Sequence, residues 1–268
     1  MGKRIAFIGC GNMGGAVARG IVRAGFSDAA DVVVTSRSEA SQAALSAELG
    51  CAGTCDNAAA VTGADVVVLG VKPQMLAGVA EGIAPNVDGD ALVVSLAAGV
   101  TLGQLAGMFR ERAKIVRVMP NLPAMVGEGM SGVTPGAGVS AEELDYVLAM
   151  FSCLGRAERV PEHLIGAVAA VSGSSPAYVA LFVEALADGA VTLGMPRAQA
   201  YTFAEQAVLG TAKFLLETGQ HPGAFKDAVC SPAGTTIAAV AELERGGLRA
   251  SVMDAMLACD KRNRELAG

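Results

Sequence analysis

The sequence has few of the residues on which many catalytic sites depend. It contains no tryptophan, three tyrosines and only two histidines, His163 and His221, which stand beside expected helix starts and suit surface or capping roles. It has no G-x-S-x-G motif, which would present a nucleophilic serine on a sharp turn. The usual signals of acyl transfer are therefore absent.

Paired cysteines are absent too. The six cysteines are scattered and form no C-x-x-C pair. Cys51 and Cys55 are four residues apart and could share a metal ion, but two histidines leave too few ligands for a full set. We therefore expect no metal cofactor and interpret the cysteines as small, buried, reduced side chains.

Excess basic charge and long apolar runs are also missing. The net charge of −6 excludes a broad basic surface for nucleic acid, and 52% apolar against 17% charged residues excludes disorder. No uninterrupted apolar run is long enough to span a bilayer, and the longest candidate, Tyr178–Leu193, carries Glu184 and Asp188, so we expect a buried helix there and no membrane span. The chain enters its first strand without a secretory signal, which predicts a cytoplasmic protein.

What the sequence does contain is a glycine motif at its start. An apolar run, Ile5–Ile8, leads into Gly9–Gly14 (GCGNMG), and a helical pattern follows. Gly9 would permit the tight turn, Gly11 would let the backbone approach a pyrophosphate, and Gly14 would let the helix pack on the strand. Phosphates would then rest on unpaired amides at the helix start. The flanking strand and helix favour dinucleotide binding over a simple turn.

A second signal follows the next apolar run, Val32–Val34. A NAD site commonly has an acidic residue about 20 positions after the glycine motif, whereas an arginine there accommodates a 2′-phosphate. Here Thr35, Ser36 and Arg37 supply two hydroxyls and a guanidinium. We predict NADPH in preference to NADH, with NADH still possible. The alternative is that Arg37 only begins a solvated helix, Ser38–Leu49.

Further apolar runs predict a parallel sheet covered on both faces. Ligands bind beyond the carboxyl ends of such strands, which nominates Lys72, Pro73, Ala97, Ala98 and Pro120–Pro123. A helix over Ala141–Leu154 would precede a last short strand. The expected strands are Asp65–Val71, Ala91–Ser95, Lys114–Met119 and Ala157–Val160.

The character of the chain changes near Val160. Val-rich runs give way to alanine-rich helical segments with few charges. The prediction is an α/β protein: a Rossmann-type doubly wound domain over residues 1–160, followed by an all-helical domain over residues 161–268. So small and apolar a helical domain favours packing against a partner subunit over standing alone.

Two segments of the helical half predict binding turns at helix starts. They are Ser172–Tyr178 and Ser231–Thr236, each with hydroxyls and backbone amides that could hold a carboxylate. Ordinary N-capping would explain the first equally well. In the second segment, Thr235 and Thr236 follow a flexible Ala-Gly pair. Two hydroxyls are more than one N-cap requires, so binding is favoured. A hydride donor without an evident acid or base suits a substrate that is already electrophilic, such as a protonated imine.

These motifs together resemble the pyrroline-5-carboxylate reductase family. The resemblance runs from the first strand to the last helix. It is carried by Phe7–Gly14, Val71–Gln74, Ala97–Val100, Arg117–Asn121, Ser172–Tyr178 and Ser231–Thr236.

The resemblance implies NAD(P)H-dependent reduction of 1-pyrroline-5-carboxylate to L-proline, the last step of proline biosynthesis. It also implies homodimers interlocked through the helical domain, which can assemble into decamers. With the motifs above, the expected cofactor site comprises Ile8, Gly9, Cys10, Gly11, Asn12, Met13, Gly14, Thr35, Ser36, Arg37, Asn57, Gly70, Val71, Lys72, Pro73, Leu96, Ala97 and Ala98.

For the substrate, the resemblance implies that amides near Gly234 and Thr235 bind the carboxylate and that the Thr236 hydroxyl lies close to the imine nitrogen, as the catalytic group. The expected substrate site comprises Glu162, Ser231, Gly234, Thr235 and Thr236. One departure stands out, because the family usually has Ser-Pro-Gly-Gly where this chain has Ala233 for the first glycine. If that residue takes a positive φ, alanine costs about 1 kcal/mol or more.

Two other functions are compatible with the glycine turn. A reductase similar to the β-hydroxyacid dehydrogenases shares the glycine turn and the helical domain, but that class places a catalytic lysine in the interdomain helix and Glu162–Leu193 contains none. The hydroxyls of Thr235 and Thr236 argue against the second alternative, a non-catalytic protein that senses NADPH, and an activity assay decides between the two.

Overall fold

A computed structural model describes residues 2–110 and 113–267 of the chain. Its contacts divide the chain into two compact units, of which the first runs to Gly173 and takes in the end of the chain from Cys259. The second unit is Ser174–Ala258. The domain boundary that we predict after Val160 rests on the change from Val-rich to alanine-rich segments in the sequence. It stays a prediction.

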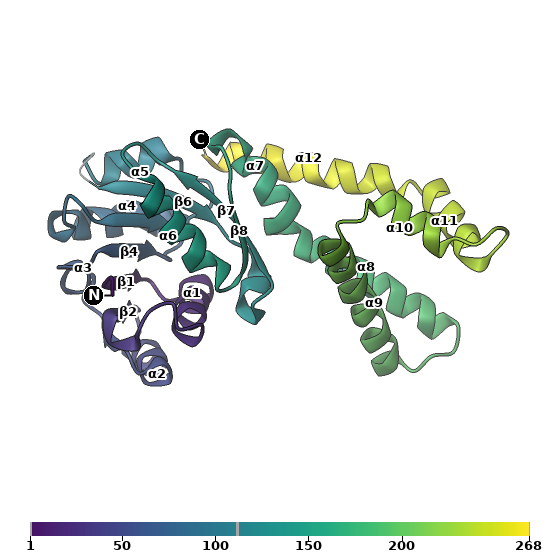
Figure 1. Cartoon of the computed structure of the whole chain (residues 1–268), viewed down its shortest axis with the longest axis horizontal. Coiled ribbons are helices and arrows are strands. Elements are labelled where there is room, and N and C mark those ends of the chain that lie inside the picture. Colours follow the sequence, from purple (N-terminus) through teal and green to yellow (C-terminus); the bar gives the residue numbers. More distant parts are fainter. Residues whose placement is uncertain (1, 111–112, 268) are drawn as a thin grey trace. The chain divides into compact units, whose positions relative to one another are not determined.

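The first unit is built on a mostly parallel sheet, as the Val-rich runs predicted. Among the described residues the strand order is β3-β2-β1-β4-β5-β6-β7-β8, and every neighbouring pair is parallel except β6 and β7. Figure 1 labels most of these strands. The strands are β1 (Ile5–Ile8), β2 (Val32–Thr35), β3 (Ala52–Thr54), β4 (Val66–Leu69), β5 (Leu92–Ser95), β6 (Lys114–Met119), β7 (Gly129–Pro135) and β8 (Gly155–Arg159).

Both faces of the sheet are covered, which explains why its central strands lack alternation of polar and apolar residues. Phe7 of β1 packs into one core with residues of α1, α2 and α6, whereas Ala6 and Ile8 pack into a second core with residues of α3, α4 and α5. The prediction of a doubly wound sheet is confirmed. The covering helices are α1 (Asn12–Arg23), α2 (Glu39–Leu49), α3 (Asn57–Val61), α4 (Pro73–Ile83), α5 (Leu102–Met108) and α6 (Ala141–Ser152).

Two strands were not predicted. β3 has only three residues, and β7 has the sequence GMSGVTP, without an apolar run. The polar residues of β7 are nevertheless buried, and the hydroxyl of Thr134 donates to the carbonyl of Val160 at 2.8 Å. A strand whose side chains are satisfied by tertiary hydrogen bonds leaves little pattern in the sequence.

The prediction of a turn at Ser172–Tyr178 is wrong, because the chain there is helical. A short helix α7 (Ile165–Val168) continues through the π-helical segment Ala169–Ser174 into α8 (Ser175–Thr192). Pro176 cannot donate to the carbonyl four residues back, that of Ser172, and this carbonyl instead accepts a 3.0 Å hydrogen bond from the side chain of Asn121. The wider π turn accommodates the proline without breaking the helix.

The second unit is helical. The chain folds back on itself so that α8 packs against α9, and the two helices lie side by side in Figure 1. The helices after α8 are α9 (Arg197–Thr218), α10 (Pro222–Val229), α11 (Thr235–Arg245) and α12 (Leu248–Ala267), the last of which ends in the first unit.

The expectation of a buried helix over Tyr178–Leu193 is wrong for a single chain. The side chains of Val179, Leu181 and Phe182 are 44%, 67% and 41% exposed, since α9 covers only part of α8. By length and composition alone the helical stretch Glu162–Thr192 could cross a membrane. Run length therefore does not exclude a span there.

Candidate cofactor and substrate sites

The turn after β1 has the backbone geometry that its glycines predicted. Gly9 has a φ of 84°, in the region that favours glycine. Its amide donates to the hydroxyl oxygen of Thr35 at 3.0 Å, and the amide of Cys10 donates to the carbonyl of Thr35 at 2.8 Å. Thr35, which is 1% exposed, thus ties the glycine turn to the end of β2.

Close backbone packing explains two further glycines. A Cβ on Gly14 would lie 2.8 Å from the carbonyl oxygen of Gly9, and a Cβ on Gly70 would lie 2.7 Å from the same oxygen and 3.0 Å from the Cα of Gly14. The neighbours are backbone atoms, which cannot yield. Only glycine at positions 14 and 70 therefore allows the turn to lie this close to the start of α1 and the end of β4.

Gly11 differs from these glycines because the space beside it is open. A Cβ there would meet nothing within 4 Å, and the N-cap position that Gly11 occupies supplies no side-chain hydrogen bond to α1. The first amides of α1 are therefore available to a ligand, and the helix dipole favours an anion. This geometry fits the pyrophosphate of a dinucleotide.

A cavity of about 210 Å³ lies beside the glycine turn. Its lining includes the cations Arg37 and Lys72, from the segments that follow β2 and β4. It brings together the predicted residues Gly9, Cys10, Gly11, Thr35, Ser36, Arg37, Asn57, Gly70, Val71 and Lys72. Cys55, Met75 and Val79 also line it and were not predicted. The i, i+4 spacing of Met75 and Val79 on α4 was the signal that could have found them.

The other predicted cofactor residues lie outside this cavity. Ile8 is buried in the sheet core, Gly14 packs on the turn, and Asn12 and Met13 begin α1. Pro73 begins α4, and Leu96, Ala97 and Ala98 follow β5, the neighbour of β4 in the sheet. The last three residues thus lie at the carboxyl ends of the strands, where ligands of such sheets bind.

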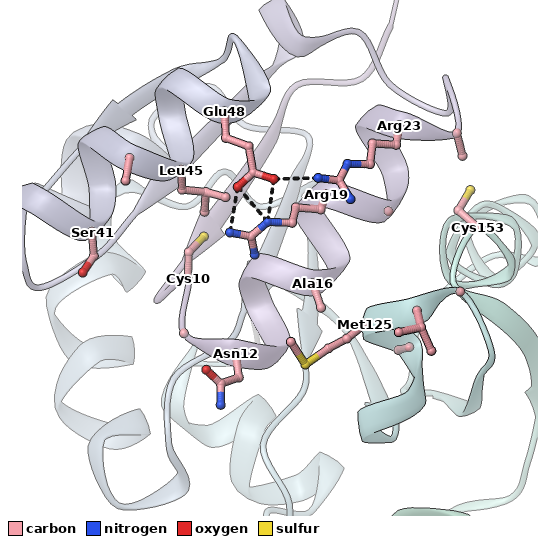
Figure 2. A pocket seen from close by; sticks show the side chains of 17 residues that line it. Cys10, Asn12, Ala16, Arg19, Arg23, Ser41, Leu45, Glu48, Met125 and Cys153 are labelled. Atoms are coloured by element: carbon pink, nitrogen blue, oxygen red, sulfur yellow. Dashed lines mark hydrogen bonds and ion pairs between the residues drawn. The ribbon is translucent and has the colours of Figure 1, made fainter. Parts of the chain in front are cut away.

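A larger hollow of about 970 Å³ opens beside the same turn, between α1, α2 and the 3₁₀ turn Leu122–Val126 (Figure 2). Its two arginines are already paired. Arg19 donates to both oxygens of Glu48 at 2.9 Å, and Arg23 donates to one of them at 2.7 Å. These bonds lower the pKa of Glu48. The arginines therefore join α1 to α2, and the smaller cavity with Arg37 and Lys72 is the better phosphate site.

Cys10, the second residue of the glycine motif, is chemically quiet. Burial raises the pKa of its thiol to about 12. The side chain is therefore a neutral thiol at physiological pH and not a nucleophile.

The candidate substrate turn, Ser231–Thr236, lies in the second unit, between α10 and α11. The amide of Gly234 donates to the carbonyl of Ser231 at 3.0 Å, which closes the turn, and Ala233 has a φ of 56°. Gly234 is the N-cap of α11 and supplies no side-chain hydrogen bond. The amides at the start of α11, beside the hydroxyls of Thr235 and Thr236, can thus receive a carboxylate.

Glu162, the remaining predicted substrate residue, is in the first unit and is engaged with protein groups. Its Oε1 accepts a 2.6 Å hydrogen bond from the amide of Leu102 and pairs with Arg117 at 3.3 Å. Arg117, which is 6% exposed, was not predicted as a functional residue. Its signal in the sequence was a charge between two valines in the middle of β6.

The histidines have the modest roles expected. Nδ1 of His221 accepts from the amide of Gly223 and caps α10, and His163 lies in the 3₁₀ turn Glu162–Leu164. Over residues 2–110 and 113–267, His, Cys, Asp and Glu side chains form no group of three that could hold a metal ion.

Two family models match the chain. Residues 162–266 match pyrroline-5-carboxylate reductase dimerisation, and residues 4–99 match the NADP oxidoreductase, coenzyme F420-dependent, family. The matched segments correspond to the helical half and to the part of the sheet that contains the glycine turn.

Whole-length relatives agree with these matches. The chain is 49% identical to the pyrroline-5-carboxylate reductase of Escherichia coli (strain K12), over 100% of this chain and 99% of that protein. A solved pyrroline-5-carboxylate reductase from Coxiella burnetii superposes with a TM-score of 0.94 at 35% identity, covering 100% of both chains. A Plasmodium falciparum pyrroline carboxylate reductase, solved with NADP bound, has a TM-score of 0.89 at 28% identity, covering 99% of this chain and 98% of that one.

Proposed function

The chain belongs to the pyrroline-5-carboxylate reductase family, and from that premise we propose where its cofactor and substrate bind. The enzyme reduces 1-pyrroline-5-carboxylate to L-proline, the final step of proline biosynthesis. The observation that carries this function is the 49% identity to a reductase of that name over the whole of this chain.

We place the cofactor along the carboxyl ends of the strands, from Arg37 past Gly11 to Ala98. The open space beside Gly11 and the amides of α1 suit the pyrophosphate. When bound, a reduced nicotinamide supplies the hydride that adds to the imine carbon. The close packing of Gly9, Gly14 and Gly70 keeps these amides in one rigid arrangement.

We place the substrate at the turn Ser231–Thr236. The amides of Thr235 and Thr236 hold the carboxylate at the start of α11, and the hydroxyl of Thr236 hydrogen-bonds the ring nitrogen. An iminium carbon accepts hydride without prior proton transfer, so the turn contributes orientation and no acid is required. This is consistent with the scarcity of histidine.

NADPH is the proposed cofactor, in preference to NADH. Support comes from Arg37, Ser36 and Lys72, which line the cavity beside the glycine turn and could meet a 2′-phosphate, and from the NADP-bound relative of known structure. We propose that the enzyme needs no metal ion.

We also propose a homodimer formed through the helical half, which can assemble further into a decamer, in the cytoplasm. The exposed apolar side chains of α8 and the match of residues 162–266 to a dimerisation family support self-association. A partner subunit on α8 would explain an uncovered apolar helix that also carries Glu184 and Asp188, without a membrane.

One assay tests the reaction. The purified chain is mixed with NADPH and 1-pyrroline-5-carboxylate, NADPH oxidation is followed by absorbance, and proline is identified in the products. We expect equal amounts of NADPH consumed and L-proline formed, and less activity with NADH. Absence of turnover with both cofactors would refute the proposed sites.

A further inference from the structure

Arg117 is a charged residue on a strand of mainly apolar ones. It lies in β6, in register with Ser95, the last residue of β5, and is 6% exposed. Burial lowers the pKa of its guanidinium, whereas the carboxylate of Glu162 partly offsets this by raising the pKa. Burying a charge is unfavourable unless a partner compensates for the lost water. The buried charge of Arg117 is therefore compensated by its ion pair with Glu162.

Glu162 joins three segments that are distant in the sequence. Its Oε1 pairs with Nη1 of Arg117 at 3.3 Å and accepts the amide hydrogen of Leu102 at 2.6 Å. Leu102 is the first residue of α5, and Glu162 itself begins the 3₁₀ turn that leads into α7 and α8. The side chains of Thr101 and Gln104 form the capping box that begins α5. The carboxylate of Glu162 ties this helix start to the turn at Glu162, and the guanidinium of Arg117 pairs with the carboxylate.

The segment held in this way is the loop of residues 96–101, between β5 and α5. At its near end the amide of Leu96 donates to Leu69 at 3.0 Å and the amide of Ala97 donates to the hydroxyl of Ser95 at 3.3 Å. The loop then turns through Gly99, which has a φ of 76°. Glu162 anchors the far end from outside the loop and its helix. Leu96, Ala97 and Ala98, which we propose as cofactor contacts, lie between the two anchors.

Glu162 and Arg117 face a hollow of their own. It has a volume of about 330 Å³ and is separate from the cavity beside the glycine turn, whose lining includes neither residue. Asp260 and Arg264 also line this hollow and pair with each other. Because each carboxylate there is matched by a guanidinium, the hollow presents little net charge to a substrate carboxylate.

We propose that Arg117 and Glu162 are positioning residues, which hold the loop of residues 96–101 in the conformation that receives the nicotinamide end of the cofactor. Glu162 then acts through the amide of Leu102 and does not touch the substrate. This role replaces the substrate contact that the family resemblance implied for Glu162, and it rests on the cofactor site proposed above.

Glu162→Ala and Glu162→Gln separate the two roles. We expect Glu162→Ala to raise the NADPH Kd, measured by calorimetry without substrate, by about tenfold, the scale of one lost charged hydrogen bond. The KM for 1-pyrroline-5-carboxylate at saturating NADPH should stay within about twofold. Glu162→Gln keeps an oxygen for the amide of Leu102, so its NADPH Kd should lie between that of Glu162→Ala and the wild-type value.

Glu143→Ala is the matched control. Glu143 lies on α6, where it pairs at 2.7 Å with Lys114, a residue of the same strand as Arg117, and accepts a 2.8 Å hydrogen bond from the amide of Ser140. It should lower Tm without changing the NADPH Kd. A raised KM for the imine acid with an unchanged NADPH Kd in the Glu162 variants would overturn the proposal in favour of a direct substrate contact. Equal effects of Glu143→Ala and Glu162→Ala on NADPH binding would overturn it in favour of general destabilisation.

Coupling between the two residues gives an independent readout. If they act as one unit, Arg117→Met should weaken NADPH binding no further in a Glu162→Ala background, and additive losses would overturn the proposal. These binding measurements need no turnover. If the wild-type chain binds NADPH but reduces no imine acid, the proposed substrate site fails while the positioning role is still tested.

Discussion

Arg37 is the residue on which, in our proposal, the choice between NADPH and NADH depends. It lies beside Ser36 in the cavity at the glycine turn, where a 2′-phosphate would meet its guanidinium. Arg37→Asp should repel that phosphate and change the ratio of kcat/KM for NADPH to that for NADH by at least about tenfold toward NADH. Arg156→Asp, the same charge change at an exposed position of β8, is the control. An unaltered ratio would show that Arg37 does not read the phosphate.

Thr236 is the residue proposed closest to the reacting nitrogen. Thr236→Ala should lower kcat/KM for 1-pyrroline-5-carboxylate by about tenfold or more, the scale of one hydrogen bond to a charged group, and leave the NADPH Kd unchanged. Thr236→Ser retains the hydroxyl and should recover most of the activity. Unchanged kinetics in Thr236→Ala would remove this side chain from the mechanism.

Ala233 carries backbone strain in the substrate turn. Its φ of 56° lies in the left-handed region, where a Cβ costs about 1–2 kcal/mol. Ala233→Gly relieves this strain but increases the entropy of the unfolded state, which offsets part of the gain. We therefore expect the free energy of unfolding to rise by up to about 1 kcal/mol. Ala239→Gly, inside α11, should lower it by about 0.5–1 kcal/mol. Urea denaturation measures both, and a destabilised Ala233→Gly variant would contradict a strained alanine.

At the level of elements, the junction of β1, α1 and β4 requires glycine at position 70. A Cβ there would lie 2.7 Å from the carbonyl oxygen of Gly9, so Gly70→Ala must push the turn away from β4. The expected result is an NADPH Kd raised at least tenfold and a loss of about 1–3 kcal/mol in stability, as for an overpacked core. Gly78→Ala in α4, where a Cβ meets nothing within 4 Å, is the control and should not weaken binding. A wild-type NADPH Kd in Gly70→Ala would show that this junction is not part of the cofactor site.

Strands buried on both faces could be predicted from the sequence, because double burial selects continuous runs such as Val32–Val34. The antiparallel strand β7 could not, since its buried Thr134 is satisfied by a distant carbonyl, that of Val160. The helix through Pro176 was missed for a related reason. The carbonyl that the proline leaves unpaired is taken by Asn121, and no local pattern reveals a partner so far along the chain.

The candidate site shows the same division. The spacing of Gly9, Gly11 and Gly14 predicts their backbone roles, and each of the three has a distinct geometry in the structure. The contacts of Glu162 depend on which amide and which guanidinium the fold brings to it, and sequence spacing does not contain that information. Arg117 was visible only as a charge that did not fit its strand.

For the whole molecule, the exposed apolar side chains of the helical half support the self-association that we propose. Leu181 and Phe182 of α8 are 67% and 41% exposed in the single chain of 26.9 kDa. Light scattering after gel filtration should report at least twice that mass at micromolar concentration. Leu181→Asp should shift the protein toward monomer, because a buried carboxylate without a partner is unfavourable. A stable monomeric wild-type chain would contradict this role of the helical half.

The central claim is that the glycine turn and the threonine-bearing turn serve the same reaction. The most direct measurement is a crystal structure of the assembled protein with NADP⁺ and L-proline. We predict that the Thr236 hydroxyl lies about 2.7–3.2 Å from the proline nitrogen, with the nicotinamide against the same ring. A turn Ser231–Thr236 that faces away from every bound nicotinamide, in its own subunit and in each neighbour, would contradict the account.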